Sequence, residues 1–156
     1  MANERDFLRH CLATLAYRGG LSLREAPEAF SRFDTGNGKT PLDILAHMGD
    51  LFAWGLTLLN GQAHWQASVP GTWERETARF FQGLARLDQF LASGEPLQAE
   101  WTRLLQGPLA DAMTHVGQMA LLRRMAGFPV PGENFFQAEI TAGRVGPDQV
   151  PPRRTF

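Results

Sequence analysis

The sequence has almost no cysteine, no surplus of either charge and no long apolar run. Its one cysteine, Cys11, excludes an internal disulfide and the cysteine-rich scaffolds of small secreted domains. The 15 basic residues are balanced by 16 acidic ones, so no basic surface for nucleic-acid phosphates is expected. The longest apolar stretch, residues 51–59, is too short to span a bilayer, and the charged N-terminus does not resemble a signal peptide. These absences predict a soluble, cytoplasmic protein that binds neither nucleic acid nor membrane.

What the sequence does contain is a set of apolar residues at helical spacing. Hydrophobic residues make up 44% of the 156 positions, which is enough for the core of one compact domain. No segment alternates with the period of a strand. Capping and breaking residues, among them Gly19-Gly20, Thr40-Pro41, Thr72 and Pro108, bound the apolar stripes. We therefore expect helices at about residues 4–18, 41–59, 72–92 and 108–126.

Four amphipathic helices cannot each bury an apolar face alone, so they predict an all-α four-helix bundle, antiparallel in large part. The bundle is expected to occupy about residues 4–127 of a single domain that spans residues 1–156. Residues 128–156 are rich in proline and glycine, which predicts an irregular C-terminal tail that wraps over the bundle.

Two of these helices carry a candidate metal site. Asp111 and His115 are four residues apart, so a helix places their side chains on one strip. If the second and fourth helices are neighbours, His47 faces this pair. Two imidazole nitrogens and one carboxylate suit zinc, iron, manganese or nickel and leave positions open for water or substrate. By spacing alone, an ordinary helix-surface pair or a hydrogen-bonded core histidine is the simpler interpretation.

Two further polar residues are candidates for orienting these ligands. Asp50 follows His47 by three residues and is a candidate hydrogen-bond partner for it, or else a solvated residue or a local salt-bridge partner. Gln118 continues the strip of His115 and is expected to bond either a bound water or another helix. Cys11 lies in the apolar stripe of the first helix and is interpreted as a small buried residue.

Two sequence segments resemble the DinB/YfiT superfamily. Residues 40–54, TPLDILAHMGDLFAW, are similar to its second-helix motif, in which the central histidine is a metal ligand, here His47. Residues 111–119, DAMTHVGQM, resemble its fourth-helix motif of two histidines separated by three residues, the second followed by Gly-Gln. His115 then matches a ligand, and Asp111 stands where the family commonly has its other histidine. Residues 123–135 also resemble a subgroup of this superfamily.

The resemblance implies a DinB-like fold and a divalent metal ion, zinc, nickel, manganese or iron, held by His47, Asp111 and His115. A carboxylate in this set adds negative charge and weakens the preference for softer metals. Characterised relatives include metal-dependent enzymes that use low-molecular-weight thiols such as bacillithiol or mycothiol. The resemblance therefore implies a thiol-dependent S-transferase or a hydrolase that acts on a small-molecule substrate, without assigning a catalytic residue. The alternative is a non-enzymatic stress-response or binding module whose metal site is vestigial.

The fourth helix also suggests self-association. It is apolar over much of its circumference, because Met113, Val116, Ala120 and Leu121 are added to the ligand strip. This pattern predicts a homodimer, unless the proline-rich tail covers the same residues.

Overall fold

The computed structural model describes residues 3–36 and 38–153, and every regular element in these residues is helical. The long helices are α1 (Glu4–Leu23), α2 (Pro41–Leu59), α3 (Trp73–Ser93) and α5 (Ala110–Met125). A 3₁₀ turn, η1 (Glu28–Arg32), precedes α2, while α4 (Trp101–Leu104) and the π-helical η2 (Leu105–Leu109) lead into α5. The all-α class is thus confirmed. The last three residues of the predicted tail lie outside the described residues.

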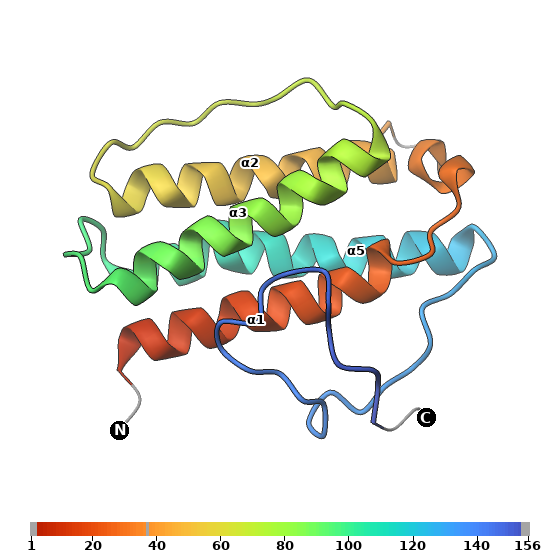
Figure 1. The fold of residues 1–156 in the computed structure, drawn as a ribbon. Helices are drawn as coiled ribbons and strands as arrows, with labels where there is room; N and C mark the ends of the chain where they lie inside the picture. The colour runs from red at the N-terminus through yellow and green to blue at the C-terminus, as the bar shows by residue number, and fades with distance from the viewer. Residues whose placement is uncertain (1–2, 37, 154–156) are drawn as a thin grey trace.

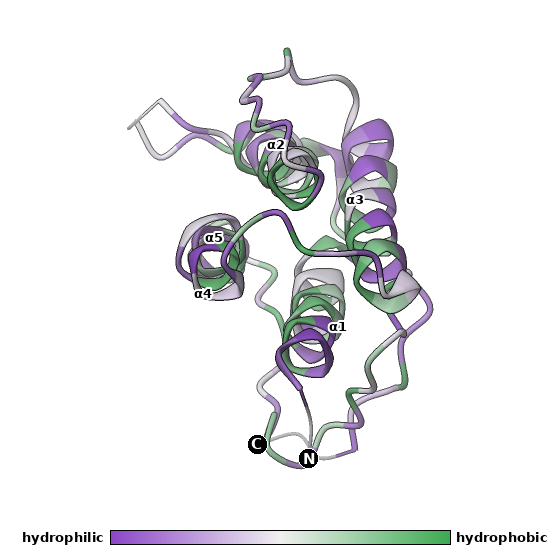
Figure 2. Ribbon diagram, turned by 90° about the vertical axis from the view of Figure 1, so that its left-hand side faces the viewer, coloured by the Kyte–Doolittle hydropathy of each residue, from purple (hydrophilic) through white to green (hydrophobic). Residues whose placement is uncertain are grey.

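The four long helices pack side by side around one core. Seen end-on, they follow one another in the order α1, α3, α2 and α5, and each contacts the next (Figure 2). Their directions are less antiparallel than expected, because α2 and α3 run the same way and α1 and α5 run opposite to them (Figure 1). The cause is the long connection 60–72, which carries the chain back along α2 before α3 begins.

Apolar side chains from every long helix fill the core between them. The largest that are almost completely buried are aromatic or long aliphatic residues, including Tyr17, Leu12, Phe52, Met48, Phe80, Leu84 and Met119. By length and composition α2 would be able to cross a membrane, with a mean hydropathy of 1.3 over its apolar window. However, 56% of that window is buried within the bundle, which is the pattern of a core helix.

The first helix continues beyond the glycine pair at which it was expected to end. Gly19 and Gly20 lie inside α1, where Gly19 makes room for the ring of Phe80. The helix ends only after Leu23, and its last carbonyls accept hydrogen bonds from Arg123 of α5. This buried guanidinium contacts three carbonyl oxygens at 2.8–3.2 Å. A tertiary contact therefore extends α1, and no local signal predicts it.

The fourth long helix starts close to Pro108, where the sequence placed its start, and a shorter helical stretch precedes it. The helical path begins at Trp101 and kinks at Gly107, whose backbone lies at φ −92° and ψ −106°. Pro108 follows this break directly and is buried beside Gly55 of α2. Asp111 lies four residues after this break, about one helical turn further along the chain.

The tail packs over α1 and α5, as the sequence predicted (Figure 1). It begins after Gly127, whose left-handed φ of 93° ends α5 with two closing backbone hydrogen bonds. Tyr17 of α1 then donates a 2.6 Å hydrogen bond to buried Glu133, and Phe135 packs edge-on against the same tyrosine. Phe136 is 97% exposed and anchors nothing.

Candidate metal centre

The position of His47 depends on how the N-terminus of α2 is capped. The Thr40 hydroxyl accepts a hydrogen bond from the Asp43 N–H, while the Asp43 carboxylate accepts hydrogen bonds from the Thr40 N–H and hydroxyl. These bonds lower the pKa of Asp43, and Pro41 at the first helical position adds a preset backbone angle. The start of α2, which matches the prediction, thereby fixes the register of His47 about two turns later.

His47, Asp111 and His115 lie together across the contact between α2 and α5. One possible ligand atom from each residue lies within 4.8 Å of the other two. Both oxygens of Asp111 take part, because Oδ2 is 3.4 Å from Nε2 of His47 and Oδ1 is 3.3 Å from Nε2 of His115. The two imidazole rings meet edge to face at 4.9 Å. The three residues that the sequence singled out therefore form one cluster.

These separations are long for hydrogen bonds and suitable for ligands of one ion. Nitrogen-to-oxygen hydrogen bonds cluster at about 2.7–3.2 Å. Two ligands that each lie about 2.0–2.2 Å from a tetrahedral ion are about 3.3–3.6 Å apart. The side chains are partly open to solvent, with exposed fractions of 33% for His47, 45% for Asp111 and 18% for His115. The arrangement can accept an ion from solution and leave part of its coordination sphere accessible.

Gln118 orients one of the ligands. Its Oε1 lies 2.8 Å from Nδ1 of His115, so this ring nitrogen donates a hydrogen bond and carries the proton of the neutral imidazole. The lone pair of Nε2 is then directed at Asp111. Two lone-pair atoms 3.3 Å apart repel each other unless a proton or a cation lies between them. The sequence had proposed a bound water or another helix as the partner of Gln118; the partner shown here for its oxygen is His115 of the same helix.

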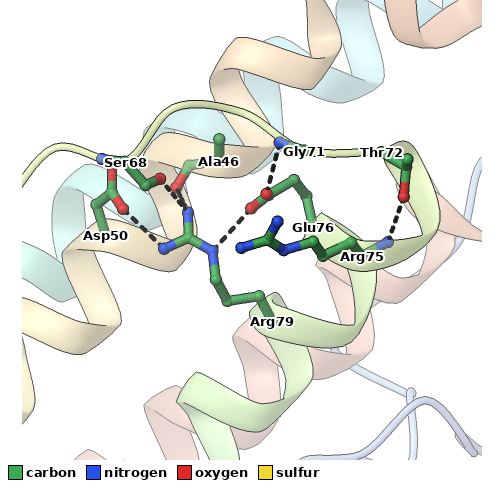
Figure 3. A network of polar contacts seen from close by, with 8 residues as sticks. All are labelled: Ala46, Asp50, Ser68, Gly71, Thr72, Arg75, Glu76 and Arg79. Atoms are coloured by element: carbon green, nitrogen blue, oxygen red, sulfur yellow. Dashed lines mark hydrogen bonds and ion pairs between the residues drawn. The ribbon is translucent and has the colours of Figure 1, made fainter.

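Asp50 does not orient His47 but forms an ion pair, which is one of the alternatives that the sequence offered for it. It is buried and accepts hydrogen bonds from the Arg79 side chain at 2.7 Å and from the Ser68 backbone at 3.0 Å (Figure 3). Arg79 also donates to Glu76 at 2.7 Å and to the Ser68 hydroxyl at 2.8 Å. Burial lowers the pKa of Arg79, but the hydrogen bonds to both carboxylates outweigh it and raise the pKa. Asp50 thus belongs to a clamp that ties connection 60–72 to α2 and α3.

The clamped connection brings an aromatic residue that sequence reasoning did not assign to the site. Trp65 lies edge-on to His47, with ring centroids 5.7 Å apart, and also edge-on to Trp54 of α2 at 5.7 Å. Next to Trp54 and Asp111 is an open cleft of about 430 Å³, also lined by Gln106, Gly107, Ala110 and Thr114. No local pattern pointed to Trp65, because its place depends on the path of a long connection.

Cys11 and His64 are not members of the cluster. Cys11 is buried, as expected, and burial raises the pKa of its thiol. His64 is exposed on connection 60–72. Glu133 of the tail is hydrogen-bonded to Tyr17 of α1.

Comparison with protein-family models, curated proteins and solved structures finds no match for this chain. The proposed function therefore rests on the cluster of His47, Asp111 and His115 and on the sequence motifs around it.

Proposed function

We propose that this chain is a DinB/YfiT-like, metal-dependent enzyme in which His47, Asp111 and His115 hold one divalent ion. The observation that carries the proposal is the convergence of three ligand atoms from two helices within 4.8 Å. The spacing of Asp111 from each histidine nitrogen, 3.3 and 3.4 Å, supports ligation over simple hydrogen bonding. The resemblance of the two helical segments supports the same three residues.

The donor set restricts the ion to borderline or hard divalent metals. Two imidazole nitrogens and one carboxylate oxygen fit zinc, nickel, manganese or iron, and no thiolate is present to favour a softer metal. Asp111 contributes one negative charge, so a divalent ion leaves a net charge of about +1 on the site. Gln118 holds the Nε2 atom of His115 in the form that ligates.

Three protein ligands leave coordination positions for a reactant, which is the arrangement of catalytic sites. A divalent ion in such a site lowers the proton affinity of a water or thiol that reaches it. We propose transfer of a low-molecular-weight thiol, or hydrolysis, on a small-molecule substrate in the cytoplasm. Around the reactant, Trp65 shields His47 on one side and Asp111 holds its charge next to the open cleft.

We also propose a homodimer. Only part of the apolar face of α5 is available for a dimer contact. Val116 is buried within the chain, whereas Leu121 is 53% exposed. Met125, one turn further along α5, is 56% exposed and extends the apolar surface available to a second copy. Light scattering at tens of micromolar is expected to give twice the mass of the chain, and a monomer mass would contradict the proposal.

Metal binding is the direct test of the proposed function. Untagged protein should retain close to one divalent ion per chain in elemental analysis. Titration of the apo protein with zinc, nickel and manganese should show binding at about micromolar dissociation constants or tighter. His115→Ala should remove this binding. The matched control is His64→Ala, because His64 is exposed and forms its hydrogen bonds to Thr57 through its backbone.

Asp111→Asn tests the carboxylate separately from the shape of the site. The amide keeps the size of the side chain but loses its charge, so zinc affinity should fall by at least about tenfold, the equivalent of 1.4 kcal/mol. If the wild-type protein binds no divalent ion more tightly than about millimolar, the metal site is rejected and the non-enzymatic alternative takes its place.

A further inference from the structure

We propose that Trp54 and Trp65 form the wall of a substrate subsite beside His47, Asp111 and His115. This subsite takes a small molecule with a flat, uncharged, apolar body and one donor atom for the ion. The inference rests on the proposed function and names the chemistry of its substrate.

The first observation is the aromatic wall itself. The rings of Trp54 and Trp65 meet at an interplanar angle of 87°, and Trp65 also covers the edge of His47. Trp65 is 45% exposed although it lies at the ligand cluster and not on a remote surface. Large aromatic surface left open beside a polar cluster is typical of sites that bind ligands. The wall therefore offers ring faces and edges to a flat ligand next to the metal ligands.

The second observation is the charge of the cleft beside this wall. Its lining consists of Trp54, Gln106, Gly107, Ala110, Asp111 and Thr114. Among these described lining residues the only charged side chain is Asp111, and no arginine or lysine is present to pair with an acidic substrate. The cleft has a volume of about 430 Å³ and is shallow and largely open to solvent.

The charges then select the substrate class. The ion and its three ligands carry a net charge of about +1, which a single bound thiolate reduces to zero after the thiol loses its proton to solvent. A second negative charge on the ligand would have no cation to pair with in the cleft, and desolvating it costs free energy. A cationic body would likewise have no free acidic side chain to pair with in the cleft, because Asp111 is engaged by the ion. An uncharged body is the remaining class.

The third observation is that hydrogen bonds hold the backbone of connection 60–72 on both sides of Trp65. The Thr57 hydroxyl donates to the Trp54 carbonyl at 2.7 Å and accepts a 3.1 Å hydrogen bond from the backbone N–H of His64. At the other end, Arg79 and Asp50 hold Ser68 (Figure 3). Because the backbone on both sides of Trp65 is fixed, little ordering is needed when a ligand binds, which favours affinity.

The test uses two thiols of the same shape and different charge. Zinc-loaded protein is titrated by calorimetry with 4-methylbenzenethiol and with 4-mercaptobenzoate. We expect the uncharged thiol to bind at least about tenfold more tightly, because the carboxylate of the other has no partner in the cleft. Trp54→Ala and Trp65→Ala should each weaken binding of the uncharged thiol by about tenfold, while zinc affinity stays as in the wild type.

Two further variants separate the wall from general effects. Trp54→Phe keeps a flat ring and should retain most of the binding, whereas Phe136→Ala removes an aromatic ring that is 97% exposed in the tail and should change nothing. Equal affinity for the two thiols, or unchanged affinity in both tryptophan-to-alanine variants, would overturn the inference while zinc binding still supports the proposed function. Failure of wild-type protein to bind zinc would overturn both.

Discussion

The sharpest structural prediction concerns two neighbouring glycines inside α1 that should respond oppositely to the same substitution. A Cβ atom added at Gly19 would lie 2.6 Å from the Cζ atom of Phe80, far inside van der Waals contact. A Cβ added at Gly20 would lie 3.6 Å from the ring of Phe81, an ordinary contact distance. Gly19→Ala should therefore destabilise the protein and Gly20→Ala should stabilise it.

The magnitudes follow from two competing effects. Replacing glycine by alanine inside a helix stabilises by roughly 0.5–1 kcal/mol, since the unfolded chain loses freedom and the helix gains propensity. At Gly19 overpacking opposes this gain at a cost of about 1–3 kcal/mol. Phe80 cannot easily yield, because it is fully buried and packed edge-on between Phe52 and Phe81. We expect a net loss of about 1–2 kcal/mol for Gly19→Ala.

Urea unfolding followed by circular dichroism measures both changes, and the two variants should differ by roughly 2 kcal/mol. The melting temperatures should then differ by about 4–8 °C for a chain of this size. The reasoning is refuted if Gly19→Ala is as stable as Gly20→Ala. That result would mean that Phe80 has room to move and that the bundle is not tightly packed there.

Three other measurements test separate parts of the structure. Arg123→Met removes the cap on the α1 carbonyls and should cost about 2–4 kcal/mol in urea unfolding, whereas Arg124→Met on the exposed side should change stability by less than about 0.5 kcal/mol. Burial, and then the hydrogen bond to Glu133, raise the pKa of Tyr17 to about 12, so its absorbance should titrate near pH 12 in the folded protein and near pH 10 in denaturant. Because the folded pKa of Tyr17 is the higher one, its contribution to stability is complete below about pH 10 and is lost as the pH rises toward 12. Zinc affinity measured by calorimetry should fall as the pH drops below about 6.5, because a histidine nitrogen ligates only when unprotonated, and an affinity unchanged at pH 5.5 would contradict histidine ligation.

The sequence predicted best where local chemistry decides the structure. Thr40 and Pro41 start α2 at the predicted residue, and the helix ends at Leu59 as expected. α3 is displaced from its predicted bounds by only one residue, and Thr72 caps it. The four-residue spacing of Asp111 and His115 correctly placed both on one side of α5.

The sequence failed where distant residues decide. Gly19 ends no helix because Phe80 occupies the space beside it and Arg123 caps the carbonyls beyond it. Trp65 was not assigned to the site for the same reason, because its position beside His47 depends on the hydrogen bonds that hold connection 60–72.

Connection 60–72 separates the affinity of the site from the stability of the fold. The connection is held at its start by Thr57 of α2. Near its end it is held by Arg79 of α3, which bonds Ser68. Residues 62–67 are exposed and contribute nothing to the bundle core. Substitutions in residues 62–67 can therefore change which ligands the site binds while the packing of the four helices stays the same. A library confined to these positions would sample ligand preferences on one unchanged scaffold.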